Sequence, residues 1–190
     1  MILMLAGLAV FIAAHGFTTQ RRPRAAVIAR IGEGPYKGLY ALVSIAGLLM
    51  IGYGYGAWRA EGPAELWHPP VWLRHLALLL MLFASIALAA AYAPGRIKAA
   101  LKHPMLVAIK LWALAHLLSN GDVATIVLAL AVLAWAVYAR ISMKWREPAA
   151  PVAPTGWIGD AAALVGGLAI YAFLAYLFHP YVVGVPVLPA

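Results

Sequence analysis

Five ionisable side chains lie inside long apolar stretches of this chain: His15, Arg74, His75, Lys110 and His116. An ionisable group at membrane depth costs on the order of a few kcal/mol or more, and such groups usually face the interior of a helical bundle, where they mark functional sites. Neutral imidazole is also a common ligand of iron and other transition metals. The two deepest histidines, His15 and His116, are therefore the first candidates for a site.

The depths of these two histidines determine which ligand they could share. At about 1.5 Å per residue, His15 lies roughly 20 Å below the outer face and His116 roughly 18 Å above the inner face. In a hydrocarbon layer of about 30 Å they are about 8 Å apart along the membrane normal. Two imidazoles placed in this way could be the axial ligands of a b-type haem. The alternative is that each histidine hydrogen-bonds to a neighbouring helix and binds nothing, and spacing alone favours this alternative.

The remaining polar candidates lie nearer the membrane faces. His75 is close to the outer face, and His103 is at the inner boundary. His103 and Lys110 are seven residues apart and share a helix face, whereas His116 is turned by about 140° from His103, so we do not expect one iron to bind both histidines. Lys110 could extend its ammonium group to the inner face or pair with a haem propionate.

Two further histidines each precede a proline at the outer boundary. They are His68 and His179. We interpret both as interfacial residues without a ligand role.

The composition of the chain restricts its class. It has 190 residues, of which 65% are hydrophobic and 11% charged, and this leaves too little polar surface for a water-soluble globule or a disordered chain. The absence of cysteine excludes disulfides, cysteine-ligated metals and covalently attached haem. No nucleotide-binding glycine pattern and no hydrolase motif occurs. The chain is therefore an integral membrane protein.

Six apolar runs are long enough, or nearly long enough, to cross the hydrocarbon. They cover residues 2–17, 39–58, 71–93, 104–119, 123–141 and 157–178. None alternates apolar with polar residues, as strands of a transmembrane barrel must. The predicted fold is an all-α, polytopic transmembrane bundle. It has five spans in residues 1–147, a cytoplasmic Pro/Ala linker at 148–156, and a sixth span with a short outer tail at 157–190.

Eleven of the 14 Lys and Arg residues lie in alternate loops. They are Arg21, Arg22, Arg24, Arg30, Lys37, Arg96, Lys98, Lys102, Arg140, Lys144 and Arg146. The positive-inside rule places these loops in the cytoplasm and both termini outside. The net charge of +8 thus indicates topology and not nucleic-acid binding.

Local signals predict several helix boundaries and contacts. Pro104 suits the first turn of a helix, and Asp122 is available to cap the helix that follows Asn120 and Gly121. Four glycines recur in the second span, at Gly47, Gly52, Gly54 and Gly56. We interpret them as sites of close helix packing in preference to a cofactor notch.

Several polar positions in this order resemble the NnrU family. They are His15, the stretch from Arg30 to Ser44, the segment from Trp72 to Ala77, and the segment from His103 to Asp122, with the resemblance running from about His15 to Lys144. The resemblance implies a bacterial inner-membrane protein linked to denitrification and nitric oxide metabolism. The family's plant relative is the 15-cis-zeta-carotene isomerase, a haem b membrane enzyme.

The resemblance also implies site residues. The positions that match the relative's ligand histidines are His15 and His116, with Lys110, Arg74 and His103 as candidate partners of the propionates or ligands. The residues after His15 depart from the family pattern, and this makes His75 the substitute ligand to test. The expected function is redox-gated chemistry on nitric oxide or on a polyene. The alternative is a non-catalytic partner that helps a nitrite or nitric oxide reductase to assemble.

Overall fold

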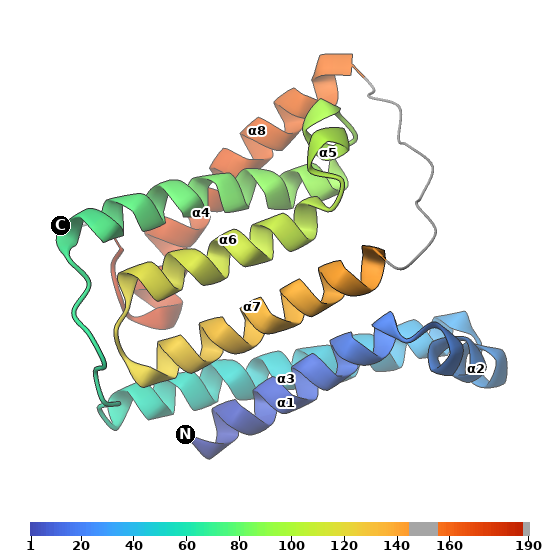
Figure 1. Cartoon of the computed structure of the whole chain (residues 1–190), viewed down its shortest axis with the longest axis horizontal. Coiled ribbons are helices and arrows are strands. Elements are labelled where there is room, and N and C mark those ends of the chain that lie inside the picture. The colour runs from blue at the N-terminus through green and yellow to red at the C-terminus, as the bar shows by residue number, and fades with distance from the viewer. Residues whose placement is uncertain (145–155, 188–190) are drawn as a thin grey trace. The chain divides into compact units, whose positions relative to one another are not determined.

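The structure, a computed structural model, describes residues 1–144 and 156–187, and within them every regular element is a helix. One isolated antiparallel bridge joins Glu65 to Asp122. The all-α prediction is confirmed (Figure 1). The predicted linker up to residue 155, and Arg146, lie outside the described residues.

The chain divides into two compact units, each formed by two separate segments. Unit 1 comprises residues 1–67 and 121–144, and unit 2 comprises residues 68–120 and 156–187. The chain therefore passes from unit 1 to unit 2, back to unit 1, and again to unit 2.

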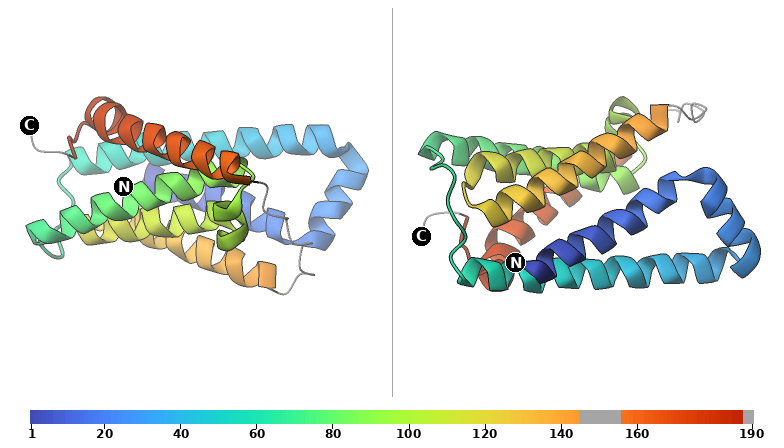
Figure 2. Two further views of the ribbon diagram at one scale, coloured as in Figure 1. Left: turned by 90° about the horizontal axis from the view of Figure 1, so that it is seen from above. Right: turned by 60° about the horizontal axis from the view of Figure 1, so that its bottom comes forward.

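Unit 1 contains α1 (Ile2–Thr19), α2 (Arg21–Ile31), α3 (Glu33–Ala60) and α7 (Val123–Lys144). Helix α1 packs along α3, α2 connects their ends, and α7 contacts both (Figures 1 and 2). The contact between α1 and α3 is close, as two glycines of α3 show. A Cβ at Gly54 would overlap the backbone of Met4, and a Cβ at Gly47 would press against Phe11. The packing interpretation is thus confirmed for these two glycines. It is wrong for Gly52 and Gly56, which face open space.

Unit 2 contains α4 (Val71–Tyr92), α5 (Arg96–Leu101), α6 (Pro104–Ser119), α8 (Gly156–Phe173) and the π-helix η1 (Leu174–Val183). Helix α4 packs against both α6 and α8. Its buried residues are mostly small, including Ala77, Ala84, Ala87 and Ala90. Small side chains let helices approach closely where no hydrophobic effect drives their association.

The two short helices α2 and α5 lie in stretches that are predicted from the sequence to be loops. Arg and Ala are both good helix formers, so these basic segments fold as helices although none of their residues is buried. Helix α2 ends at Gly32, whose φ of 87° lies in the region that favours glycine.

Within the part of the chain that the structure describes, five helical segments are long and apolar enough to cross a membrane: α1, α3, α4, α7, and α8 together with η1. The remaining predicted span, residues 104–119, corresponds to α6, which is apolar but only 16 residues long. At 1.5 Å per residue it extends about 24 Å, which is less than a hydrocarbon layer of about 30 Å. Pro104 at its start and Asn120 after its end limit its length.

Candidate functional site

His15 lies near the end of α1 in unit 1, with one ring nitrogen already bonded. Its Nδ1 donates a hydrogen bond to the carbonyl of Phe11, 2.8 Å away. A carbonyl can only accept, so the proton is on Nδ1 and the lone pair of the neutral ring is on Nε2. Ligand histidines are commonly fixed in this way, through the nitrogen that does not bind the metal.

Aromatic rings from three helices surround the His15 imidazole. Phe11 of α1 stacks on it at a centroid distance of 3.9 Å, Trp135 of α7 meets it edge-on at 5.2 Å, and Tyr40 of α3 is tilted at 5.3 Å. The indole Nε1 of Trp135 is buried and has no hydrogen-bond partner among the described residues. A donor left unpaired in such a setting indicates a position for an acceptor that the protein chain does not itself supply.

The residues after His15, where the chain departs from the family pattern, hold the end of α1. The Thr18 hydroxyl donates to the carbonyl of His15 at 2.7 Å, and the Thr19 hydroxyl donates to the carbonyl of Gly16 at 2.6 Å. Thr19 also bonds to the hydroxyl of Tyr138 on α7, at 3.3 Å. The threonines therefore fix the helix turn that carries the histidine.

His116 occupies an equivalent position in unit 2, near the end of α6. Its Nδ1 donates to the carbonyl of Trp112 at 2.8 Å, and the Trp112 ring lies 4.4 Å from it. The Asn120 side chain donates to the carbonyl of His116 at 3.0 Å, and the Ser119 hydroxyl donates to that of Ala115 at 2.8 Å. The lone pair of the neutral His116 ring is thus also on Nε2.

His179 is not among the site residues that the sequence predicts. It lies half-buried in η1, and its ring is 6.2 Å from that of His116 with an interplanar angle of 25°. Its Nδ1 donates to the carbonyl of Leu174 at 2.8 Å. The interpretation of His179 as an interfacial residue without a ligand role did not anticipate this contact with His116. The only sequence signal was a histidine before a proline at the end of an apolar run.

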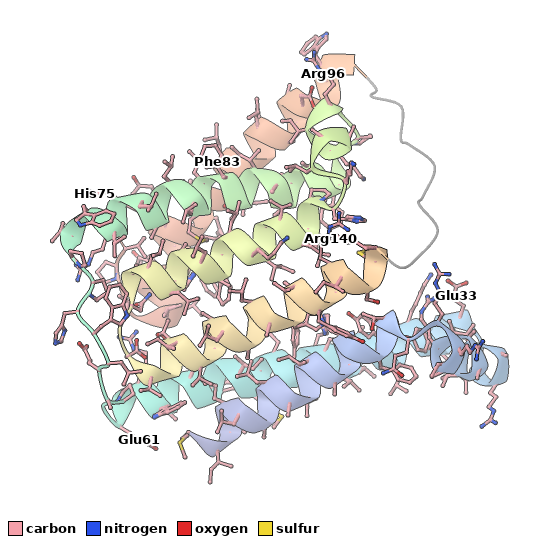
Figure 3. The ribbon with its side chains drawn as sticks, viewed as in Figure 1. Glu33, Glu61, His75, Phe83, Arg96 and Arg140 are labelled. Carbon is pink, nitrogen blue, oxygen red and sulfur yellow. The ribbon has the colours of Figure 1, made fainter. Side chains whose placement is uncertain are left out.

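The other candidates lie on α4 and α6 of the same unit. Arg74 and His75 are exposed in the first turn of α4, where Figure 3 labels His75. His103 is the N-cap of α6, and 13 residues of helix place it about 20 Å from His116 along the axis. Lys110 is half-buried about 9 Å from His116 along the same axis.

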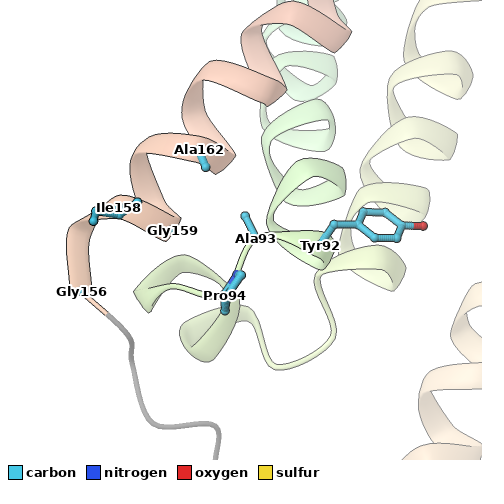
Figure 4. A pocket seen from close by; sticks show the side chains of 7 residues that line it. All are labelled: Tyr92, Ala93, Pro94, Gly156, Ile158, Gly159 and Ala162. Atoms are coloured by element: carbon cyan, nitrogen blue, oxygen red, sulfur yellow. The ribbon is translucent and has the colours of Figure 1, made fainter.

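A pocket of about 570 Å³ lies between the end of α4 and the start of α8 (Figure 4). Its lining residues include Tyr92, Pro94 and Ile158. Because α6 runs back from this end of unit 2 to His116, the pocket is not the histidine site.

The comparison with family models determines the family. The NnrU protein family model matches residues 3–187. The chain belongs to the NnrU family. The NnrU match includes α8 and η1, so it extends beyond the stretch from His15 to Lys144 on which the resemblance was based. No curated protein and no solved structure matches the chain significantly.

Proposed function

We propose that this NnrU-family membrane protein binds haem b through its membrane-depth histidines, with His15 and His116 as the iron ligands. The observation that carries the proposal is shared by the two residues. Each donates its Nδ1 proton to the carbonyl four residues earlier, at 2.8 Å, and keeps Nε2 for a ligand. A histidine that only packs in a bundle would be expected to use its second nitrogen across the helix interface.

The chemistry of the residues around His15 fits a haem. A porphyrin supplies four nitrogens, so its iron needs only one or two imidazoles from the protein. The flat aromatic faces of Phe11 and Tyr40 suit a flat apolar ring, and the unpaired Nε1 of Trp135 suits an acceptor such as a propionate.

The reaction chemistry follows from what the histidines do. When bound, the haem would supply an iron able to bind nitric oxide or to act on a polyene double bond, in keeping with a nitric oxide-linked or isomerase-like function. His15 and His116 would hold and orient the iron, and the helix ends that carry them are fixed by Thr18 and Asn120.

The topology is part of the same proposal. The alternation of basic loops supports six spans in a bacterial inner membrane, with both termini in the periplasm. A helix as short as α6 can cross where the bilayer thins around it or where flanking side chains reach the interface. Lys110 of α6 has a stem that allows such an extension.

Absorption spectra test the proposal. Protein purified in mild detergent, with hemin added where needed, should give a Soret band and, after reduction with dithionite, the α and β bands of a b-type haem. His116→Ala should abolish these bands, and His15→Ala should shift them. His75→Ala tests the substitute ligand, and His68→Ala, at an exposed histidine of the same unit that is not a candidate ligand, is the matched control; both should leave the bands unchanged.

Two results would contradict the assignment. A wild type that stays colourless after hemin addition would refute haem binding and favour the alternative, a non-catalytic partner in reductase assembly. Loss of the bands in His75→Ala would instead transfer the ligand role to that histidine.

A further inference from the structure

The pocket in unit 2 has mostly apolar walls. Its volume is about 570 Å³, and its walls come from the end of α4, the turn before α5 and the start of α8 (Figure 4). Apart from Tyr92, every lining residue is Gly, Ala, Pro or Ile. Ligand pockets commonly have volumes of about 300–1,000 Å³ and mostly apolar walls. This pocket therefore suits an apolar ligand or the apolar part of a larger one.

Close contacts hold the walls of the pocket together. A Cβ at Gly159 of α8 would overlap the carbonyl of Pro94, and a Cβ at Gly95 would lie 2.5 Å from Oδ1 of Asp160. The start of α8 is thus packed directly against the turn between α4 and α5. A ligand would meet walls that are already in place, and this lowers the cost of binding.

The pocket lies where two candidate membrane spans have their ends. Helix α4 ends at Tyr92, and the span that contains α8 begins at Gly156. At these ends Tyr92 is 77% exposed and Trp157 is 69% exposed. Exposed Tyr and Trp residues at the ends of spans are typical of the interface between hydrocarbon and headgroups. Membrane lipids are therefore the apolar ligands available at this level.

Two cations are fixed at the edges of the pocket. Nε of Arg96 donates to Asp160 on the α8 side, at 2.8 Å, and the ammonium group of Lys98 donates to the carbonyl of Ala91 on the α4 side, at 2.7 Å. Each acceptor is the sequence neighbour of a lining residue. The Arg96 side chain is still 69% exposed, so the terminal nitrogens of its guanidinium remain accessible. Their planar arrangement matches the geometry of a phosphate group.

The charge at this end of unit 2 is positive. Helix α5 and the residue that follows it carry three cations, Arg96, Lys98 and Lys102, and Asp160 is the only acidic residue among those described in unit 2. Basic pockets between membrane helices typically bind anionic lipid headgroups. The charge therefore favours an anionic lipid over a neutral one.

Lys102 has a backbone conformation that glycine would adopt more easily. Its φ is 59°, and no other described residue except glycine has a positive φ. Strained backbone is found preferentially at functional sites and ligand clamps. Lys102 is exposed and lies about 9 Å beyond Arg96 along α5, so its ammonium group adds to the same positive region.

We propose that this end of unit 2 binds an anionic phospholipid, with an acyl chain in the pocket and the phosphate group against Arg96 and Lys98. Lys102 strengthens the attraction without contacting the acyl chain. The inference requires that α4 and α8 cross the membrane, but it does not require that the protein binds haem.

Native mass spectrometry of the full-length protein in a neutral detergent tests the site. The probes are dioleoylphosphatidylglycerol, which is anionic, and dioleoylphosphatidylcholine, which has no net charge. The wild type should retain one phosphatidylglycerol under conditions that remove phosphatidylcholine. Lys98→Gln and Lys102→Gly should each weaken phosphatidylglycerol binding roughly fivefold. Because Lys102→Gly also relieves the backbone, weaker binding in this variant cannot be attributed to misfolding. Arg30→Gln, at an exposed cation of α2 in unit 1, is the matched control and should bind as the wild type does.

A second pair of variants tests the acyl-chain pocket without changing any charge. Ala162→Phe places a ring in the pocket and should weaken phosphatidylglycerol binding, whereas Val165→Phe, at an exposed position of α8 outside the lining, should not. Circular dichroism and gel filtration verify that each variant is folded.

Three results would overturn the inference. They are equal retention of the two lipids by the wild type, unchanged phosphatidylglycerol binding in Ala162→Phe, and displacement of the lipid by inorganic phosphate, which would indicate a simple anion site. The test contains no hemin, so its failure leaves the haem proposal intact. A wild type that binds no haem likewise leaves the lipid site standing.

Discussion

Asp160 of α8 accepts a hydrogen bond from the backbone N–H of Ile97, 2.9 Å from its Oδ1 and 63 residues earlier in the chain, and so caps the helix α5 that begins at Arg96. The other carboxylate oxygen accepts from Nε of Arg96 at 2.8 Å. Figure 3 labels Arg96 on this helix, α5. The carboxylate thereby fastens α5 to α8, although its cationic partner is exposed.

Two substitutions of Asp160 should lower the stability of unit 2 to different extents. Asp160→Asn keeps an oxygen for the Ile97 N–H but loses the charge that pairs with Arg96, and Asp160→Ala loses both. We expect the thermal midpoint to fall slightly for Asn and by several degrees, about 2–4 °C or more, for Ala. Tryptophan fluorescence during heating in detergent measures it.

The control for this series is Glu33→Ala, which removes an exposed pair with Lys37 within a single helix. Exposed pairs of this kind contribute little to stability, so this variant should unfold close to the wild-type temperature. Equal midpoints for Asp160→Ala and Glu33→Ala would contradict a fastening role for the carboxylate.

Two glycines on α3 provide a matched comparison of helix packing. A methyl group at Gly54 would overlap the backbone of Met4, whereas one at Gly52 meets nothing within 4 Å. Gly54→Ala should cost about 1–3 kcal/mol of unfolding free energy, as overpacking does. Gly52→Ala should be neutral or stabilising by up to about 1 kcal/mol. Unfolding by titration with a denaturing detergent measures both, and equal effects would show that α1 and α3 do not approach closely at Gly54.

Trp135 should contribute to haem affinity through its indole N–H. Trp135→Phe keeps an aromatic ring beside His15 and removes only the unpaired donor. Hydrogen bonds to charged groups contribute about 1.5–3 kcal/mol, so the affinity for hemin should fall by roughly 10-fold or more. Hemin titration followed at the Soret band measures this, with the exposed Trp157→Phe as control. An unchanged affinity would mean that no acceptor on the cofactor meets Trp135.

The topology can be tested with single cysteines because the chain has none of its own. Membrane-impermeant thiol reagents should label Glu61→Cys from the periplasmic side and Lys144→Cys only from the cytoplasmic side. Both wild-type residues are exposed at helix ends. For α6, Ala100→Cys should react from the cytoplasm and Ser119→Cys from the periplasm. Labelling of these two from the same side would show that α6 does not cross.

Signals that act over a few residues allowed prediction of helix boundaries from the sequence. Helix α6 spans Pro104–Ser119 as predicted, with Pro104 at its start. Asp122 caps α7 as predicted, since its Oδ1 accepts the Thr125 N–H at 2.9 Å and its Oδ2 accepts the Thr125 hydroxyl at 2.7 Å. Such caps involve residues three positions apart, so their types in sequence suffice to predict them.

Relationships between distant residues could not be predicted in this way. Helical periodicity places a glycine in a span but does not say which side meets a neighbour, and this is why Gly52 and Gly54 could not be distinguished. The contact between His116 and His179 depends on how α8 packs along α4 and so positions η1. The π-helix that carries His179 has no reliable sequence signature. The Nδ1 bonds of His15 and His116 also required coordinates.

The interleaving of the two units affects how the protein can be assembled. Helix α7 belongs to unit 1 but is synthesised after α4, α5 and α6 of unit 2, so unit 1 cannot finish folding when its first segment has left the ribosome. Unit 2 likewise remains incomplete until α8, which packs against α4, has been synthesised. A truncation after residue 144 would therefore release a chain whose first unit is whole and whose second lacks both a packing partner and His179. In such a chain, loss of the proposed haem site would be a failure of biogenesis and not of chemistry.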